Sequence, residues 1–117
     1  MKTYTLDIPL YSLNVYRNAH HRQLHGVKRD FQESIGWQLR MQGLETFKPP
    51  VATVFEFNFK DNKLRDLDNL SPVVKFIHDT MVELGMIPED HYRVVTAVSM
   101  RVGKRRDGTI DVTVHNV

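Results

Sequence analysis

The stretch that decides the fold is residues 51–59, Val-Ala-Thr-Val-Phe-Glu-Phe-Asn-Phe. Apolar or β-branched residues at every second position, from Val51 to Phe59, indicate a β-strand with one buried face. The first residues are apolar or β-branched on both faces, so the strand is expected to begin buried on both sides. A proline pair precedes it and a polar, turn-like segment follows it.

An amphipathic helix is expected before this strand. Between residues 21 and 44, apolar side chains recur three and four positions apart, which is the spacing of one helix face. Phe31 and Trp37 lie near this stripe and are expected in the core. Residues 10–19 are polar and predict a loop, and the alternation over residues 4–8 predicts a first strand.

A second helix and two strands are expected after residues 51–59. Ser71-Pro72 marks a helix start, because proline at the first helical position lacks an N–H that would be unpaired anyway; a start near Asp68 is the alternative. Gly85 ends the helix. Two strands, over residues 94–102 and 110–114, follow with a turn between them. We therefore predict one α/β (α+β) domain over residues 1–117, with a mixed sheet of about four strands, two helices and the order β-α-β-α-β-β.

The composition fits one globular domain. Of 117 residues, 41% are hydrophobic and 26% are charged, which excludes a disordered chain or a coiled coil. No apolar run approaches 18 residues, and the N-terminus lacks the apolar core of a signal peptide. Cysteine is absent, which excludes disulfides, zinc-thiolate sites and thiol nucleophiles. We expect a cytoplasmic protein with no membrane partner.

The net charge of +2 is unevenly distributed. Residues 14–29 and 101–106 are rich in Lys, Arg and His and contain no acidic residue. Two basic segments on a nearly neutral protein suit a polyanion such as nucleic acid. The alternative interpretation is that the two basic segments are simply solvated loops, and the charge alone favours this alternative.

The clearest chemical signal is Arg-Asp-Leu-Asp-Asn-Leu at residues 65–70. If the backbone is extended there, Asp66 and Asp68 point the same way, about 6.6 Å apart along the chain. Two such carboxylates offer the hard oxygen ligands that Mg²⁺ prefers. The alternative is that Asp68 caps the helix and that Asp66 pairs with Arg65 or Lys63.

A third carboxylate, Asp90, follows the second helix in Pro88-Glu89-Asp90. Its place relative to Asp66 depends on strand direction. A β-α-β connection normally gives a parallel pair, which puts Asp90 at the opposite end of the sheet from Asp66. An antiparallel pair would bring the two together, and the residues alone leave both arrangements open.

Lys75 lies opposite much of the apolar stripe of the second helix, four residues before Asp79. One interpretation is a surface ion pair between these two residues. The other is a cation beside a carboxylate–metal site, where it would hold a phosphate or stabilise developing charge.

Together these features resemble the RusA family of Holliday-junction resolvases, small enzymes common in phages and prophages. The similarity covers most of the chain, is specific from residue 65 to about residue 95, and includes the opening strand followed by a His/Arg-rich helix start. The motifs that carry it are residues 65–70, Lys75, Leu84-Gly85, Pro88-Glu89-Asp90 and Tyr92-Arg93-Val94-Val95.

The resemblance implies a Mg²⁺-dependent endodeoxyribonuclease, with Mn²⁺ as a substitute and no small-molecule cofactor. It implies a homodimer that resolves four-way DNA junctions by paired symmetric nicks, in DNA recombination and repair, inside a bacterial cell or phage-infected host. The family's metal carboxylates, which converge, match Asp66, Asp68 and Asp90. The family's essential helix lysine matches Lys75 when positions are counted back from Gly85. When positions are counted forward from Asp66, Lys75 is offset by about three residues from the place of that lysine.

DNA contacts are expected around the paired aspartates and in the two basic segments. Asn69 matches the family's asparagine after the paired aspartates, which would orient a carboxylate or contact DNA. The basic segments would hold junction arms by their phosphates, with a salt-sensitive and largely sequence-independent affinity. The expected DNA-binding residues are His20, Arg22, Lys63, Arg65, Asn69, Lys104, Arg105 and Arg106.

Three other hypotheses use the same residues. A related Mg²⁺ nuclease would act on flaps, forks or replication intermediates. A non-catalytic DNA-binding module would keep the fold without the chemistry. An ordinary structural domain predicts that Asp68→Asn alters only stability, by about 1 kcal/mol through helix capping.

Overall fold

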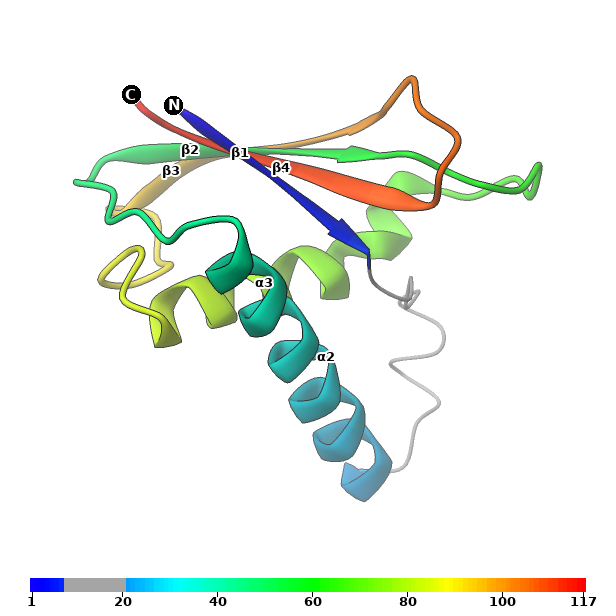
Figure 1. Ribbon diagram of the computed structural model, residues 1–117, viewed down its shortest axis with the longest axis horizontal. Coiled ribbons are helices and arrows are strands. Elements are labelled where there is room, and N and C mark those ends of the chain that lie inside the picture. The colour runs from blue at the N-terminus through cyan, green and yellow to red at the C-terminus, as the bar shows by residue number, and fades with distance from the viewer. Residues whose placement is uncertain (8–20) are drawn as a thin grey trace.

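The computed structural model describes residues 1–7 and 21–117, without the side chains of residues 21–25 and 27. The expected loop over residues 10–19 lies outside the described residues. The predicted fold class and element order are confirmed, with a 3₁₀ helix added before the second α-helix (Figure 1). The elements are β1 (Lys2–Asp7), α2 (His21–Met41), β2 (Val51–Phe57), η1 (Leu67–Leu70), α3 (Ser71–Glu83), β3 (Val95–Val102) and β4 (Thr109–Asn116).

The four strands form one mixed sheet in the order β1-β4-β2-β3. β4 is antiparallel to both of its neighbours, whereas β2 and β3 are parallel. The parallel pair follows from the α3 crossover that connects β2 to β3. The segment after β2 and the segment before β3 therefore leave the sheet at opposite ends.

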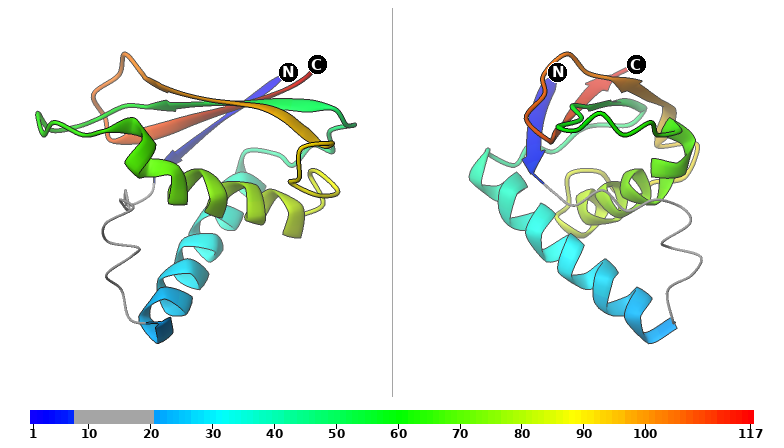
Figure 2. Two further views of the ribbon diagram at one scale, coloured as in Figure 1. Left: turned by 180° about the vertical axis from the view of Figure 1, so that it is seen from behind. Right: turned by 90° about the vertical axis from the view of Figure 1, so that its right-hand side faces the viewer.

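Both α-helices cover the same face of the sheet (Figure 2). The core lies between these layers, and the rings of Phe31 on α2 and Phe76 on α3 meet edge to face with centroids 5.1 Å apart. Trp37 was expected in the core, but it is 64% exposed. Trp37 lies two positions from the buried Ile35, about 200° around the helix, so it points away from the sheet.

The helix ends follow the glycines. α2 ends at Met41 rather than at residue 44, and Gly43 follows with a φ of +88°. Gly85, with a φ of +74°, ends α3 as expected, and the N–H of Met86 donates to the carbonyl of Met81. At the other end of α3, η1 runs directly into Ser71, so both predicted starting points contain helical backbone.

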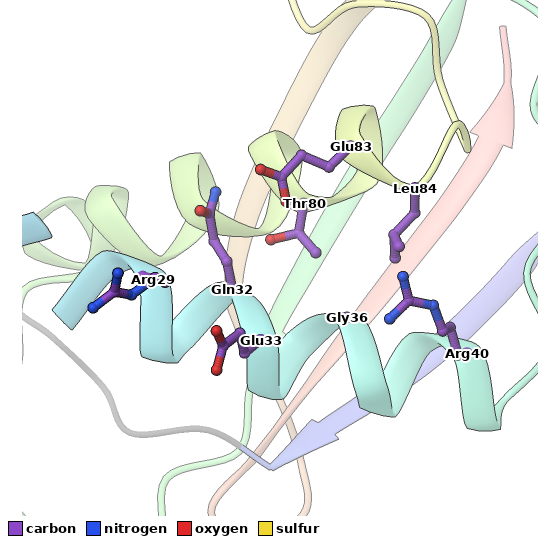
Figure 3. A pocket seen from close by; sticks show the side chains of 8 residues that line it. All are labelled: Arg29, Gln32, Glu33, Gly36, Arg40, Thr80, Glu83 and Leu84. Carbon is purple, nitrogen blue, oxygen red and sulfur yellow. The ribbon is translucent and has the colours of Figure 1, made fainter. Parts of the chain in front are cut away.

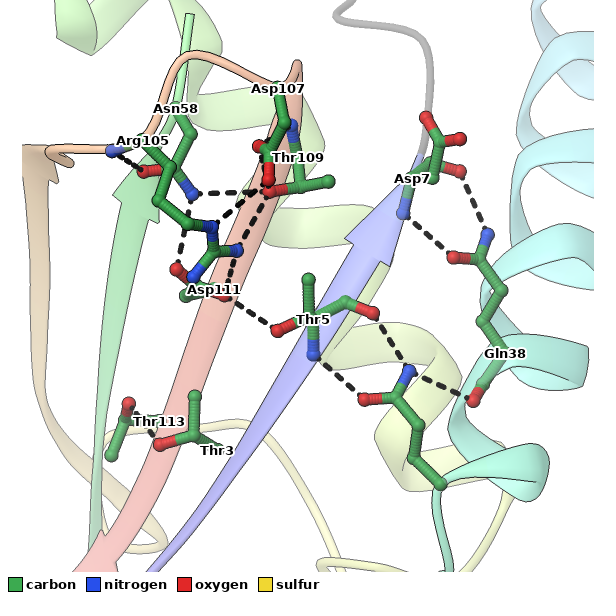
Figure 4. A network of polar contacts seen from close by, with 11 residues as sticks. Thr3, Thr5, Asp7, Gln38, Asn58, Arg105, Asp107, Thr109, Asp111 and Thr113 are labelled. Carbon is green, nitrogen blue, oxygen red and sulfur yellow. Dashed lines mark hydrogen bonds and ion pairs between the residues drawn. The ribbon is translucent and has the colours of Figure 1, made fainter.

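The two edges of the sheet differ. On β1, the side-chain amide of Gln42 accepts from the N–H of Thr5 at 2.8 Å and donates to its carbonyl at 2.7 Å. Gln38 does the same with Asp7, at 2.7 and 2.8 Å (Figure 4). Gln38 of α2 and Gln42, directly after α2, therefore satisfy the outer backbone groups of β1 at Thr5 and Asp7. β3, at the other edge, pairs only with β2 within the described part of the chain.

Candidate functional site

Asp66 is the N-cap of η1, and Asp68 lies in its first turn. Asp66 has extended backbone (φ −86°, ψ 124°), and its carbonyl accepts from the N–H of Asn69. Both Asp66 and Asp68 are exposed. Leu70, not Asp68, is the N-cap of α3, and the carboxylates of both aspartates make no hydrogen bond or ion pair with residues that the structure describes. The helix-capping and local-pairing alternatives are therefore not observed.

Arg65 pairs with Asp61 instead. Its guanidinium makes two bonds to that carboxylate, at 2.6 and 2.9 Å, and lies over the ring of Phe59 at 5.1 Å. The Arg65 bonds and the N–H of Lys63 hold the pKa of Asp61 well below its usual range. These contacts shape the loop that leads to the paired aspartates. They also pair the charge of Arg65, an expected DNA-binding residue, with an acidic side chain of the protein itself.

Lys75 lies at the centre of an ion-pair chain made of Lys28, Asp79, Lys75 and Asp90. The Lys75 Nζ contacts Asp79 Oδ1 at 2.9 Å and Asp90 Oδ2 at 2.8 Å. The other oxygen of Asp79 contacts the Nζ of Lys28, on α2, at 3.1 Å. The carboxylates raise the pKa of Lys75, and Lys75 lowers the pKa of Asp90. The predicted helical ion pair is present, and it extends to two further residues.

The segment between α3 and β3 brings Asp90 to Lys75. Met86 and Ile87 are buried, and the carbonyl of Met86 accepts from the N–H of Phe47. The carbonyl of His91 then accepts from the N–H groups of both Val94 and Val95, which closes the turn into β3. The Asp90 side chain consequently lies beside the middle of α3 rather than at its C-terminal end.

His78 is a buried titratable residue beneath this chain that the sequence did not single out. It is 6% exposed, shares a 2.9 Å hydrogen bond with the hydroxyl of Thr53, and meets the Phe55 ring edge to face. Burial lowers the pKa of His78 to about 4. The sequence signal that could have identified His78 as buried is its position within the apolar stripe of α3, directly after Ile77.

The structure brings Lys75 to Asp90 but does not gather three carboxylates. Within residues 1–7 and 21–117, no group of three His, Cys, Asp or Glu side chains is arranged to hold a metal ion. β2 and β3 are parallel, which is the arrangement for which the sequence analysis expected Asp66 and Asp90 at opposite ends of the sheet. In donor chemistry, the carboxylates of Asp66 and Asp68 fit a hard cation such as Mg²⁺.

The basic segment at 101–106 is largely occupied by contacts within the protein. Arg105 contacts Asp107 at 3.0 Å and Asp111 at 2.9 Å (Figure 4). The side-chain hydrogen bond from Thr109, followed by that from Arg105, lowers the pKa of Asp107 to about 2. Arg106 donates to the carbonyl of Phe59 and to the side chain of Asn62. Among the described residues, Lys104 has no hydrogen bond or ion pair.

Some of the expected DNA-binding residues nevertheless share a surface. A hollow of about 420 Å³ lies between the loop after β2 and the loop after β3, and Lys63, Lys104 and Arg106 line it together with Asp61. His20 lies outside the described residues, and the side chain of Arg22 is also not described.

A second hollow, of about 300 Å³, lies between α2 and α3 (Figure 3). Arg29 and Arg40 line it on α2, and Thr80 and Glu83 line it on α3. The sequence analysis did not identify this groove, because it depends on how the two helices pack. Because both basic and acidic side chains line this groove, its charge does not indicate one class of ligand.

Comparisons with known proteins found no match to any family model or to any curated protein. Among the described helices, none is long and apolar enough to cross a membrane. The functional argument therefore rests on the motif residues and on the geometry of the site.

Proposed function

We propose that this protein is a Mg²⁺-dependent endodeoxyribonuclease of the RusA type, which nicks four-way DNA junctions in symmetric pairs. It would act as a homodimer in the cytoplasm of a bacterial cell or phage-infected host. The observation that carries the proposal is the pair Asp66 and Asp68, two exposed carboxylates without a described partner, just before a helix whose lysine contacts Asp90. Exposed acidic pairs without a cation are unfavourable beside DNA, so a pure binding protein gains nothing from them.

The carboxylates of Asp66 and Asp68 would hold the metal, with Mn²⁺ as a substitute for Mg²⁺. Asp90 would be the third ligand, which requires it to exchange Lys75 for the metal. When bound, the ion would acidify a water and polarise a phosphate oxygen. Asn69, next to Asp68 in η1, would orient a carboxylate or contact the DNA.

The cations near the site would act on the phosphate backbone. Lys75, released from Asp90 but still paired with Asp79, would stabilise negative charge that develops on the phosphate. Lys63, Lys104 and Arg106, around the hollow between the two loops, would hold a neighbouring phosphate. Affinity from such contacts is largely independent of sequence, so the choice of a junction would come from the shape of the DNA and of the dimer.

A second candidate is a DNA-binding module that has lost catalysis. The specific observation that favours it is the ion pair between Lys75 and Asp90, which ties up the expected third ligand. This candidate predicts junction binding without cleavage at any divalent ion.

The test is a cleavage assay on labelled four-way junction, flap, fork and matched duplex, with Mg²⁺, with Mn²⁺ and with EDTA. We expect paired nicks on the junction that need the divalent ion. Asp68→Asn should fold and bind the junction but should not cut it. Asp30→Asn, at an exposed aspartate on α2, is the matched control and should cut normally.

The outcomes separate the candidates. Equal cutting of flaps or forks would favour a broader branched-DNA nuclease. Binding without cutting would favour the non-catalytic module. An Asp68→Asn protein that cuts at the wild-type rate would refute the site assignment.

A further inference from the structure

We propose that Asp79 is the positioning residue of Lys75, and that Lys28 fixes Asp79 in that role. The inference rests on the proposed function and deepens it, because it names two residues outside the motif on which the proposed reaction depends. The juxtaposition is an ion-pair chain that runs from α2 through α3 to Asp90.

The two oxygens of Asp79 have separate partners. Oδ1 contacts Lys75 at 2.9 Å and Oδ2 contacts Lys28 at 3.1 Å. The side chain of Asp79 is only 19% exposed, whereas that of Lys75 is 60% exposed. The carboxylate is thus the fixed and less solvated partner, and the long lysine side chain is the one that needs to be held.

Asp79 and Asp90 do not hold Lys75 in equivalent ways. Asp79 lies one helical turn after Lys75 on the same rigid element, so their contact survives any movement of the segment between α3 and β3. Asp90 belongs to that segment and is the carboxylate that the proposed function assigns to the metal. When Asp90 takes another cation, Asp79 remains the acidic partner of Lys75 within the described structure.

The electrostatics agree with this geometry. The bond to Asp79 is the largest cause of the raised pKa of Lys75, ahead of the bond to Asp90.

Lys28 supplies the connection to the second helix. Among the described residues, it supplies the ion pair that Asp79 makes with α2, and it occupies the oxygen that Lys75 does not use. Without it, the Asp79 carboxylate can rotate about its χ angles, and the position of Lys75 becomes less well defined.

Four variants test the inference. Asp79→Asn keeps the shape and removes the charge, Asp79→Glu keeps the charge, and Lys28→Met keeps an apolar stem without the amine. Glu83→Gln is the matched control, because Glu83 is an exposed acid one turn further along α3 with no ion pair to described residues.

Three quantities are measured for each variant: the single-turnover cleavage rate on the four-way junction, the Kd for that junction, and the pH dependence of Lys75 acylation by mass spectrometry. For Asp79→Asn we expect a cleavage rate about 10- to 100-fold lower, with an unchanged Kd and a lower pKa of Lys75. Asp79→Glu should restore most of the rate, and Lys28→Met should lower it less than Asp79→Asn does.

The results distinguish this inference from the proposed function. If the wild type cuts and Asp79→Asn cuts equally fast, the inference is wrong although the function stands. If the wild type does not cut, the function is wrong, and acylation of Lys75 still tests the contact. Lys75 reactivity that is identical in wild type, Asp79→Asn and Lys28→Met would overturn the positioning role, and thermal unfolding of each variant identifies a loss of fold.

Discussion

Asn58, the residue that follows β2, closes the loop between β3 and β4. It is buried, its Nδ2 donates to Thr109 and Asp111, and its Oδ1 accepts from the N–H of Arg105 (Figure 4). A Cβ atom at Gly103 would lie 2.0 Å from that Oδ1. The loop therefore requires a residue without a side chain at position 103.

Gly103→Ala should destabilise the protein by about 1–3 kcal/mol, because the methyl group must displace a buried and fully bonded amide. The free energy of unfolding from urea titration measures this loss. In an Asn58→Ala background the same substitution should cost much less. Gly26→Ala is the control, since an added Cβ there has no neighbour within 4 Å. Equal stability of Gly103→Ala and wild type would contradict the steric argument.

His78 should make the stability of the protein sensitive to acid. Its folded pKa of about 4 lies below the 6.5 of an ordinary histidine, so the unfolded chain binds the proton first as the pH falls. The contribution of His78 to the free energy of unfolding is complete above pH 6.5 and falls by up to about 3 kcal/mol between pH 6.5 and pH 4.

Urea titrations at several pH values between 4 and 7 test this prediction. His78→Gln, which keeps a hydrogen-bonding group for Thr53, should flatten that part of the curve. His91→Gln, at an exposed histidine in the segment before β3, should keep the slope. A wild-type curve that is already flat over this range would rule out the buried neutral histidine.

At the scale of elements, Gln38 of α2 and Gln42, just after the end of α2, act as a partner for β1. Each makes two bonds of 2.7–2.8 Å to the outer backbone of the strand. We expect Gln38→Ala and Gln42→Ala each to lower the free energy of unfolding by about 1–2 kcal/mol, since each leaves an N–H and a carbonyl without their partners.

Hydrogen exchange gives the more specific measurement. The amides of Thr5 and Asp7 should exchange faster in Gln42→Ala and Gln38→Ala, respectively. Gln32→Ala, on the same helix but with no such bond in the described structure, is the control and should leave both amides protected. Unchanged exchange rates at these two amides would contradict the prediction, because they would show that the hydrogen bonds to the glutamines do not protect these amides.

The elements were predictable from the sequence because each depends on local periodicity. The alternation over 51–59 predicted β2, which ends two residues earlier at Phe57, and the glycine at position 85 predicted the end of α3. The expectation that Trp37 lies in the core is wrong, because Trp37 is near the apolar stripe of α2 but does not belong to it. The strand order β1-β4-β2-β3 depends on contacts between distant segments, which periodicity does not contain.

The residues of the candidate site are a prediction from the motif, and most of their contacts do not follow from the sequence. The i,i+4 spacing of Lys75 and Asp79 predicts their ion pair, and the structure contains it. The contact between Asp79 and Lys28 depends on how α2 packs against α3. The pairing of Arg65 with Asp61 needs the loop before η1 to turn back on itself, which no spacing rule specified.

At the scale of the whole molecule, the distribution of charge predicts how the proposed DNA binding depends on salt. The affinity for DNA should fall steeply as salt rises, because phosphate contacts release counterions. Lys104→Gln should reduce the slope of log Kd against log salt concentration by about 1, as expected for one lost phosphate contact. Arg105→Gln should change the slope less, because Arg105 already pairs with Asp107 and Asp111.

Fluorescence anisotropy with a labelled junction at several NaCl concentrations measures these slopes. Thr3→Gln, on the opposite strand edge of the sheet, is a neutral control. A wild-type affinity that does not change with salt would remove the case for phosphate contacts. An Arg105→Gln slope reduced as much as that of Lys104→Gln would mean that Arg105 leaves its internal partners to bind DNA.

The shielding of β1 by Gln38 and Gln42 also limits how copies of this protein can assemble. Two copies that met through their β3 edges would form a single sheet of eight strands, four from each copy. Both outer strands of that sheet would be β1, whose backbone groups at Thr5 and Asp7 are already bonded to glutamine amides. Growth would stop at two, because an open fibre needs a free edge on each new copy. A protein whose sheet has one shielded edge can therefore pair with a second copy through the other edge and form a closed dimer.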